Sequence, residues 1–466
     1  MSEIPAQEII SIPDSSSDDS SVWSPAYRSL TIGLLLIITA AAFEALAVAT
    51  IMPTVERELG QVELYGWVFS AFFLTKLVSI SLTGAEVDRL GPAIPFAMGV
   101  LCFVAGLLVG GLAQSMPILV AGRILQGLGA GAISAVAYAA IARVYPESLK
   151  PRMLALNSTA WIIPGIIGPG IAGVIASFVS WRWVFLALVP FPLIALFMAM
   201  PSLRLLKNAE AGTHRLGRAL LANLLAIGAG IVLAGLSMPM LWRIPMLVGG
   251  GILTIVSLHR LTPEGTLRAR SGLPAAIACM GLVSMTFFGA DTFVPLTLST
   301  IRGQSPIVIA VILTAATITW TAGSWILDRL AARVSRRRVV AIGLTLVASS
   351  IAIFALTLWP AFPIPLSILA WAVCGLGIGL CYTTLSLIVL ELAPAGREGV
   401  STSALQLTDN LGTAIGAGVG GAIVASFGET ALAQALGLQF ALMTVLCILA
   451  LPIALRLPGV PERSSS

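Results

Sequence analysis

The stretch WIIPGIIGPGIAGVIASFVSWRWVF, residues 161–185, decides the fold, because it joins a membrane-spanning apolar length to two prolines and four glycines. In lipid, a helix that contains proline survives only where neighbouring helices or a water-filled cavity satisfy its freed backbone groups. Small residues and the second proline recur along it at three- and four-residue spacing: Gly165, Pro169, Ala172, Gly173 and Ala176. The stretch therefore predicts a helix inside a bundle, with a smooth face on which another helix packs closely and slides.

The whole chain has the composition of an integral membrane protein. Of its 466 residues, 58% are hydrophobic and only 10% are charged, whereas roughly a quarter of the residues in soluble domains are charged. Apolar runs of the roughly 20 residues that cross a bilayer occur fourteen times. They lie at 30–53, 64–84, 93–113, 117–141, 153–178, 182–200, 218–237, 241–259, 273–298, 306–327, 339–358, 364–390, 400–426 and 436–457.

We interpret the fourteen spans as two six-helix blocks with two extra helices between them, an all-α organisation typical of transporters built from internal repeats. The predicted parts are a disordered cytoplasmic tail, a first bundle, a linker with the extra helices, a second bundle and a short cytoplasmic tail. They occupy residues 1–27, 28–203, 204–270, 271–457 and 458–466. The first tail is polar, Ser-rich and acidic, a composition typical of disorder.

The positive charges predict the orientation. Of 26 Lys and Arg residues, twenty lie on the side that holds the N-terminus, four on the other side, and two, Lys76 and Arg123, within spans. Basic loops stay in the cytoplasm, so we expect both termini there. Arginine outnumbers lysine 23 to 3, which favours a bacterial plasma membrane. The net charge of +5 then reflects topology and contact with membrane lipid, and no nucleic-acid partner is expected.

Cysteine and histidine predict no metal site. All five cysteines lie in apolar runs without metal-ligand spacing. Both histidines, His214 and His259, lie in predicted cytoplasmic loops, which excludes a histidine relay within the membrane.

Each block carries an Asp-Arg pair after its second span, Asp88-Arg89 in GAEVDRLG and Asp328-Arg329 in GSWILDRLAARVSRRR. A surface salt bridge at a helix end would explain either pair, but the repetition favours a conformational latch. Each block also carries one acid on its first span, Glu44 in the first and Asp291 in the second.

Several stretches occur in an order that resembles the major facilitator superfamily, in its fourteen-helix drug:proton antiporter branch, across residues 28–457. They are FEALAVATIMP, GAEVDRLG, GRILQGLGAG, PGIIGPGIAG and SWRWVF. The resemblance implies the major facilitator fold. It also implies a link between antiport and the glycine-proline pattern of the fifth span (Gly165, Gly168, Pro169 and Gly173), and between proton coupling and Arg123. The first span departs from the pattern, because Glu44 stands where the family usually has Asp.

Glu44 and Arg123 are predicted to lie at the same depth. At 1.5 Å per residue, Glu44 lies about 21 Å above the cytoplasmic start of its span, and Arg123 lies at about that height on the fourth span. A direct or water-bridged pair is therefore possible. Glu44 would bind and release a proton while Arg123 favours its ionised form, or the two would form a static ion pair that locks packing. Asp291, predicted near the outer boundary, is a second proton carrier or a solvated group.

Lys76 and Asp409 also share a predicted depth, about 14 Å from the cytoplasm. In the resembled fold their helices face each other across the boundary between the bundles. We expect a Lys76–Asp409 bridge that forms when the cytoplasmic side closes, unless Lys76 instead extends to the membrane interface.

Aromatic residues dominate the candidate substrate site. Those within spans are Phe43, Tyr138, Trp161, Phe287, Phe288, Trp320, Trp371 and Tyr382. We select Trp161, Tyr138 and Phe288 as substrate contacts, together with Gln126, which could equally hydrogen-bond a helix backbone. An aromatic cavity with few polar groups suits a hydrophobic or amphipathic molecule, and Glu44 would favour cations.

The pattern favours a proton-coupled exporter that works by alternating access, and we expect a monomer without cofactors. The sequence contains no GxxxxGK[ST] motif, so ATP-driven export is not expected. One alternative is a dedicated exporter of a lipid or natural product. Another is a membrane-embedded lipid-modifying enzyme, which would need a cluster of His, Asp or Glu in a hydrophilic loop that the sequence lacks. We therefore expect a transporter rather than an enzyme.

Overall fold

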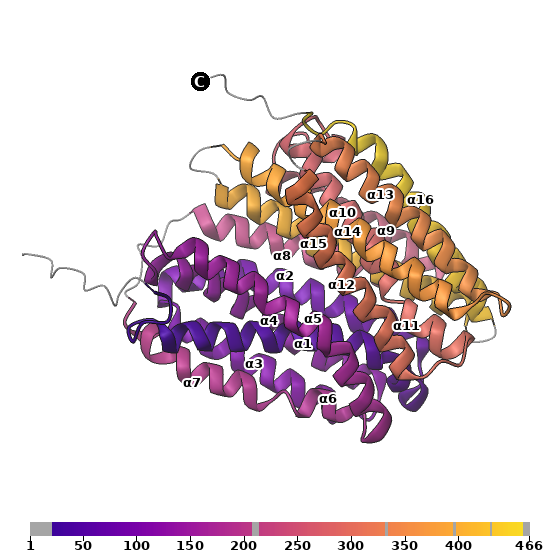
Figure 1. Cartoon of the computed structure of the whole chain (residues 1–466), viewed down its shortest axis with the longest axis horizontal. Coiled ribbons are helices and arrows are strands. Elements are labelled where there is room, and N and C mark those ends of the chain that lie inside the picture. The colour runs from indigo at the N-terminus through magenta and orange to yellow at the C-terminus, as the bar shows by residue number, and fades with distance from the viewer. Residues whose placement is uncertain (1–20, 207–213, 331–333, 395–397, 429–430, 460–466) are drawn as a thin grey trace, which may run out of the picture.

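We describe a computed structural model of the chain over residues 21–206, 214–330, 334–394, 398–428 and 431–459 (Figure 1). Every regular element in these ranges is a helix. Fourteen helices among them are long and apolar enough to cross a membrane, which confirms the predicted fold class and number of spans. Asp88, Asp328 and Arg329 have side chains outside the described part of the structure, so the predicted Asp-Arg latches stay predictions.

The first bundle contains six spans. Its elements are α1 (Arg28–Leu59), η2 (Val62–Leu64), α2 (Tyr65–Leu90), α3 (Ala93–Gly111), α4 (Met116–Val144), α5 (Lys150–Phe178), α6 (Arg182–Leu186) and α7 (Pro190–Arg204). The sixth span, predicted as one helix, is broken between α6 and α7. Pro190 explains the break, because it lacks the N–H that would bond to the carbonyl of Leu186. α5, in contrast, continues through Pro164 and Pro169.

The two extra helices are α8 (His214–Leu236) and α9 (Met240–Leu261). Leu225 and Leu233 of α8 belong to an apolar cluster that also contains Leu77 of α2 and Ala414 of α15 (Glu398–Phe427). α8 therefore packs against both bundles at once. α9 packs on α8, and much of its outer face, for example Trp242, is exposed.

The second bundle also contains six spans. Its elements are η3 (Thr266–Arg268), α10 (Leu273–Asp291), α11 (Val294–Leu296), η4 (Thr297–Ile301), α12 (Pro306–Leu330), α13 (Arg336–Ala355), η5 (Leu356–Leu358), α14 (Ile364–Leu392), α15 and α16 (Leu432–Ala454). The first of these spans is interrupted after Asp291 and continues through α11 and the π-helical turn η4. Pro295 leaves the carbonyl of Asp291 without its helical partner, which explains the interruption.

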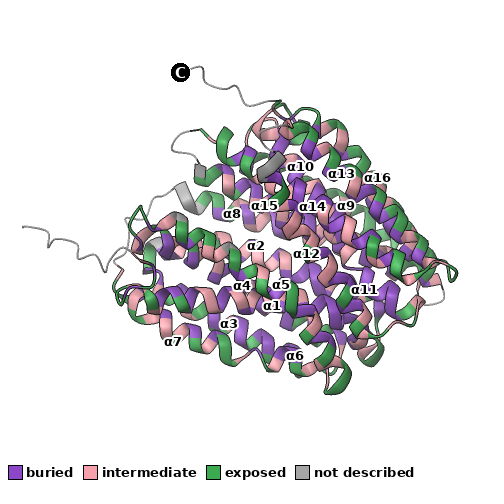
Figure 2. Cartoon of the chain, viewed as in Figure 1, coloured by how far each residue is buried: buried purple, intermediate pink, exposed green. Residues whose placement is uncertain are grey.

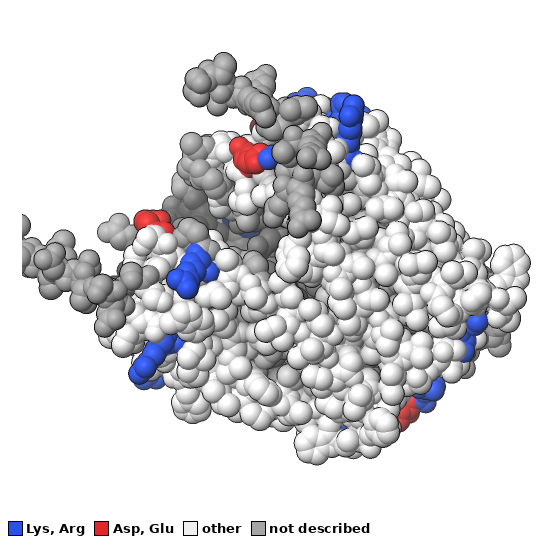
Figure 3. Space-filling view, in the orientation of Figure 1, with Lys and Arg blue, Asp and Glu red and all other residues white. Residues whose placement is uncertain are grey.

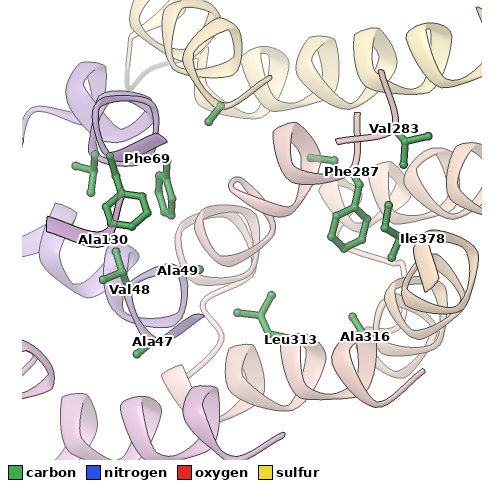
Figure 4. Close-up of a cluster of buried hydrophobic side chains, with 14 of the residues drawn as sticks. Ala47, Val48, Ala49, Phe69, Ala130, Val283, Phe287, Leu313, Ala316 and Ile378 are labelled. Atoms are coloured by element: carbon green, nitrogen blue, oxygen red, sulfur yellow. The ribbon is translucent and has the colours of Figure 1, made fainter. Parts of the chain in front are cut away.

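Both bundles contain buried residues, visible as purple ribbon inside both halves in Figure 2. Figure 4 shows Val48, Phe69 and Ala130 packed on one side and Val283 and Phe287 on the other. All five side chains are buried. The buried apolar residues of both bundles belong to one continuous cluster, so the apolar interior runs from one bundle into the other where the bundles touch.

The bundles meet along two seams, α2 against α15 and α5 against α12. In the first seam, Ser70 Oγ donates a hydrogen bond to Ala414 O at 2.8 Å. In the second seam, a Cβ on Gly173 would lie 3.0 Å from Pro306 O. The small-residue face of α5 therefore lies against another helix at close range, the packing that small residues allow in membranes.

We call the end of the molecule that holds Arg28 and Ala454 the terminal side, and the opposite end the distal side. On the distal side the bundles touch, and the fully buried rings of Tyr65 and Phe293 lie 5.7 Å apart. Toward the terminal side, Figure 3 shows the surface hollowed between the bundles. Among the described residues, no atom other than the backbone of α2 itself lies within 4 Å of the position a Cβ would take on Gly84. The structure is therefore closed at the distal side and open toward the terminal side.

Residues 21–27, the last seven of the predicted disordered tail, are part of the described structure. Residues 21–27 form turns, and Val22 is fully buried. Thr31 Oγ1 donates a hydrogen bond to Val22 O at 2.8 Å, and the rings of Tyr27 and Tyr145 lie 5.3 Å apart. The prediction of disorder up to residue 27 is therefore wrong for its last seven residues, because an apolar anchor follows the polar stretch.

Gly66 lies at a point of close approach in the α2–α15 seam, because its Cβ would lie 2.6 Å from Ala417 O and from Gly421 Cα. Overpacking of this kind costs roughly 1–3 kcal/mol. We therefore expect Gly66→Val to separate the distal ends of α2 and α15. Phe293→Cys, in a protein whose native cysteines are replaced by alanine, should then react about tenfold faster with a membrane-impermeant maleimide added from the distal side.

Gly249→Val on α9 provides the matched control, because no atom of the described residues, apart from the backbone of α9 itself, lies within 4 Å of the Cβ position there. Equal labelling rates in the Gly66 and Gly249 variants would contradict the proposed seam.

Candidate functional site

A buried ion pair joins α1 to α4. Arg123 Nη1 donates to Glu44 Oε1, and the two side chains are only 2% and 1% exposed. Arg123 Nε also donates to Val68 O at 3.0 Å, and its guanidinium lies 4.3 Å from the centre of the Phe72 ring. The ion pair that the matching depths of Glu44 and Arg123 predicted is therefore a direct contact. Residues of α2 enclose it from a third side.

Small residues on α4 bring its neighbours close enough to enclose the pair. A Cβ on Gly127 would lie 2.1 Å from Thr75 Oγ1 of α2, and a Cβ on Gly122 would lie 2.9 Å from Gly110 N of α3. α4 can therefore approach α2 and α3 with almost no side-chain volume between the backbones. This close packing leaves the Arg123 side chain only 2% exposed.

Two polar atoms of the site have no hydrogen-bond partner in the described structure. They are Glu44 Oε2 and Gln126 Nε2. A buried oxygen without a donor is costly for a carboxylate, and the same oxygen can accept a proton. The geometry therefore leaves one Glu44 oxygen available for protonation while the other faces Arg123.

Gln126 lies in the interior of the first bundle. It is fully buried, and its Oε1 accepts a hydrogen bond from Arg123 Nη1 at 2.6 Å. Its side chain lies against Gly106 of α3. Gln126 therefore faces Arg123 and α3 in this structure, and the predicted substrate contact there stays a prediction.

Asp291 lies deeper than the sequence predicts. Its span continues to Ile301, so Asp291 lies roughly 15 Å from the distal end of the span at 1.5 Å per residue. Trp371 Nε1 of α14 donates to Asp291 Oδ1 at 2.9 Å. The span ends at Ile301 instead of at the predicted residue 298, so Asp291 lies somewhat farther from the distal end than expected, and its role stays a prediction. An acid at an interrupted helix is a recurring feature of transport sites.

A second acid of the same bundle, Asp409 of α15, accepts two hydrogen bonds. Ser284 Oγ donates at 2.6 Å, and Tyr382 OH donates at 3.1 Å. Lys76 of α2 interacts electrostatically with Asp409 and with Glu44, while its Nζ lies 5.9 Å from the centre of the Phe73 ring. Lys76 and Asp409 form no ion pair in this open state, so their predicted bridge stays a prediction for the closed state.

Aromatic rings form a continuous wall along the second bundle, defined here as Phe287, Phe288, Trp320, Trp371 and Tyr382. Trp320 lies 5.5 Å from Phe287 and 5.5 Å from Tyr382, centre to centre, and Phe287 stacks on Trp371 at 6.0 Å. Phe288, Trp320 and Tyr382 are partly accessible, whereas Phe287 and Trp371 are buried. The aromatic wall thus carries an acid at each end, Asp291 through Trp371 and Asp409 through Tyr382.

Trp161 and Tyr138 of the first bundle are 42% and 45% exposed. Trp161 lies four residues before Gly165 and seven before Gly168, so it shares the face of α5 that meets α12 and α1. Tyr138 lies in the neighbourhood of Tyr382 of the second bundle. Both predicted substrate contacts therefore lie beside the space between the bundles.

The glycine-proline face of α5 lies against two helices. A Cβ on Gly165 would lie 2.4 Å from Thr317 Cγ2 of α12, and one on Gly168 would lie 3.5 Å from the ring of Phe43 in α1. Pro169 is buried within the continuous helix. This face therefore touches both bundles at once.

A polar cluster that the sequence did not single out closes the distal end of the first bundle. Glu58 pairs with Arg182 Nη1 and accepts a hydrogen bond from Trp181 Nε1 at 2.6 Å. Arg182 Nη2 also donates to Ala113 O at 3.1 Å. The motif SWRWVF signals Trp181 and Arg182, but nothing in the sequence shows that Glu58 is their partner.

Arg89 of the predicted latch lies on the surface. Its guanidinium is 3.9 Å from Glu86, with side chains that are 73% and 43% exposed. This is a weak surface pair. Within the described residues, no group of three or more His, Cys, Asp or Glu side chains could hold a metal ion.

The chain belongs to the Major Facilitator Superfamily, whose family model matches residues 32–259 and 276–466. It is accordingly a membrane transporter and not an enzyme. The multidrug efflux pump SdrM of Staphylococcus aureus (strain N315) is 25% identical over 417 residues, which cover 84% of this chain and 89% of that protein. A probable multidrug-efflux transporter of Mycobacterium tuberculosis (strain ATCC 25618 / H37Rv) is 27% identical over 422 residues, covering 86% and 89%.

Solved structures share the fold. A peptide transporter, POT, crystallised with alafosfalin has a TM-score of 0.67 at 16% identity, covering 91% of this chain and 94% of that one. A bacterial homologue of the human lysosomal transporter Spinster, in an inward-facing and unoccupied conformation, has a TM-score of 0.63 at 14% identity, covering 92% and 96%. At these identities the likeness concerns the fold alone.

The buried pair yields a stability prediction. Arg123→Leu leaves the Glu44 carboxylate buried without its partner, which should lower the free energy of unfolding by about 3–5 kcal/mol. Adding Glu44→Gln should recover more than half of that loss, because no uncompensated charge remains. The measurement is thermal unfolding of the purified variants in detergent. A double variant as unstable as the sum of the two single variants would show that the groups do not stabilise each other.

Proposed function

We propose that the chain exports hydrophobic or amphipathic, drug-like cations by exchange with protons. One observation carries this proposal: a carboxylate, Glu44, is buried in the first bundle against Arg123 and keeps one oxygen without a partner. Ionisable groups at membrane depth are costly and mark proton or substrate pathways. The names of the relatives, multidrug efflux pumps, support export as the direction.

The excess of basic residues in loops on the terminal side supports its assignment to the cytoplasm. In this orientation both termini are cytoplasmic, and the structure is open to the cytoplasm and closed to the exterior. The protein then works as a monomer in a bacterial plasma membrane, without cofactors, driven by the proton gradient. Its partners are the substrate, protons and membrane lipid.

Glu44 carries the proton in this proposal. Protonation removes its charge and weakens its attraction to Arg123, and deprotonation restores the pair. Because the charged pair strengthens the contact between α1 and α4, the proton changes the relative stability of the two conformations of the protein. A ligand shifts such an equilibrium by its differential affinity for the two states. Asp291, at the interrupted helix of the second bundle, is the second candidate carrier.

The aromatic wall binds the substrate in this proposal. The accessible rings Phe288, Trp320 and Tyr382 provide apolar faces, and aromatic faces attract cations. Asp291 and Asp409 place negative charge at the two ends of the wall. Trp161 and Tyr138 face it from the first bundle. An aromatic pocket with a few placed acids fits an apolar cation better than a polar nutrient.

A dedicated exporter of a lipid or natural product is the second candidate, because the same aromatic surface accommodates an uncharged apolar chain. The two candidate functions differ in the range of substrates that the protein would accept. Competition among chemically unrelated cations at one site favours the drug exporter, whereas a single accepted compound favours the dedicated one.

Transport in inverted vesicles with ethidium, a planar aromatic cation, separates coupling from binding. Glu44→Gln should still bind ethidium but should lose uptake driven by an imposed pH gradient, because a neutral amide cannot release a proton. Trp320→Ala should retain gradient-driven uptake at saturating ethidium but bind it about tenfold more weakly, since a cation–ring contact in a dry site contributes about 1–2 kcal/mol.

Glu63→Gln is the matched control for Glu44→Gln, because Glu63 is exposed at the distal end and should tolerate the change. Normal gradient-driven uptake by Glu44→Gln would remove Glu44 from the coupling mechanism.

Lys76 and Asp409 provide the gate in this proposal, pairing when the terminal side closes. Lys76→Asp and Asp409→Lys should each abolish transport, because each places two like charges at the seam. The double variant Lys76→Asp/Asp409→Lys should restore at least about a tenth of the native rate, since it restores an attraction of similar size. Absence of any rescue, with both proteins folded and inserted, would exclude the bridge.

A further inference from the structure

A pocket of about 680 Å³ lies on the terminal side, where α9 leads into the second bundle. None of its lining residues belongs to the aromatic wall. Its lining residues come from the last turns of α9 and from the turn that follows, including η3. They are Ile255, Val256, His259, Arg260, Glu264, Gly265, Leu267, Arg268 and Arg270. The transport mechanism uses none of them.

The turn that forms the pocket floor is tied down by hydrogen bonds. The backbone N–H groups of Arg268 and Arg270 both donate to Gly265 O at 3.1 Å. Arg456, beyond the end of α16, donates from Nη1 to Arg268 O at 2.9 Å and to Ala269 O at 3.1 Å. The pocket is therefore a fixed feature of the fold, anchored to the end of the chain's last helix.

Gly265 is required at its position for two reasons. Its φ is +89°, a conformation that other residues rarely adopt. A Cβ there would also lie 2.5 Å from Arg270 Cδ. The glycine thus lets the aliphatic part of Arg270 lie directly against the turn, which holds the guanidinium at the pocket.

The pocket has an excess of positive charge without internal partners. Arg260, Arg268 and Arg270 are exposed, and none of them makes an ion pair with another described residue. Glu264 is the single acid of the lining and makes no ion pair there either. Three guanidinium groups that converge on one cavity are suited to bind the oxygens of a phosphate group.

The same pocket is apolar on the side nearer the membrane. Ile255, Val256 and Leu267 are 57%, 44% and 46% exposed. Ile255 and Val256 belong to α9, whose outer face also exposes Ile252 and Val248 toward the lipid. A basic floor therefore continues into an apolar track along a membrane-spanning helix.

We propose that this pocket binds an anionic phospholipid, with its phosphate on Arg260, Arg268 and Arg270 and its acyl chains along the outer face of α9. Arg260 lies one residue before the end of the α9 span, the depth at which headgroups meet the helix. Basic pockets beside transmembrane helices on the cytoplasmic side bind anionic headgroups. A small soluble phosphate would use the guanidinium groups but not the apolar track. The bound lipid links α9 to the turn that leads into the second bundle.

The test measures lipid retained by the purified full-length protein, using native mass spectrometry. The probes are dioleoyl phosphatidylglycerol, dioleoyl phosphatidylcholine and glycerol phosphate. Native protein should bind phosphatidylglycerol at least about tenfold more tightly than phosphatidylcholine, because each arginine near a charged headgroup contributes about a factor of five. Arg260→Gln/Arg268→Gln/Arg270→Gln should lose this preference.

Arg28→Gln/Arg152→Gln/Arg218→Gln is the matched control, because it removes three exposed arginines from the same side of the protein but outside the pocket. It should keep the preference for phosphatidylglycerol. If both triple variants lose it equally, or if the pocket variant keeps it, the proposed site is excluded. Glycerol phosphate bound as tightly as the lipid would exclude the lipid and leave a soluble phosphate ligand.

Two single variants guard against misfolding of the pocket variant. Arg260→Gln and Arg268→Gln remove guanidinium groups that make no hydrogen bond within the described structure, and each should weaken phosphatidylglycerol binding about fivefold. Unchanged binding in both would overturn the proposal.

Discussion

The ion pair between Glu44 and Arg123 is the constraint on which the rest of the structure depends. Burial of either charge alone would cost several kcal/mol, and their mutual attraction offsets this only at close range. α1, α2 and α4 must therefore pack tightly around them. The glycines of α4 permit this approach, as the short distance from Gly127 to Thr75 shows. Any event that neutralises the acid weakens the interaction that holds these helices in one arrangement.

The two bundles share a fold but differ in chemistry. The first encloses its charges, whereas the second presents an aromatic wall tied to Asp291 and Asp409. Small residues at the α2–α15 and α5–α12 seams allow the bundles to touch without interlocking side chains. α8 packs on α2 and α15 together, so the inserted helix pair lies beside one of the two seams between the bundles. This arrangement places the buried acid Glu44 and the aromatic wall on opposite sides of one boundary.

The sequence predicts how deep a residue lies along its helix better than it predicts which side of the helix the residue occupies. Hydrophobic length and the charge pattern suffice for the fourteen spans, and residue counts place Glu44 and Arg123 at one level. The face that a residue presents depends on which neighbour lies there. Gln126 therefore faces α3, and Glu58 has partners, Trp181 and Arg182, that no spacing reveals. Asp291 is somewhat deeper than predicted because its span ends at Ile301 instead of at residue 298.

The account requires that Glu44 lose or gain a proton when the binding site changes state. Addition of ethidium to purified protein in weakly buffered detergent solution, followed with a pH indicator, measures this exchange directly. Native protein should release protons on binding, and Glu44→Gln should bind ethidium with little or no release. Release by Glu44→Gln equal to that of the native protein would contradict the account, because the exchanged proton would then belong to another group.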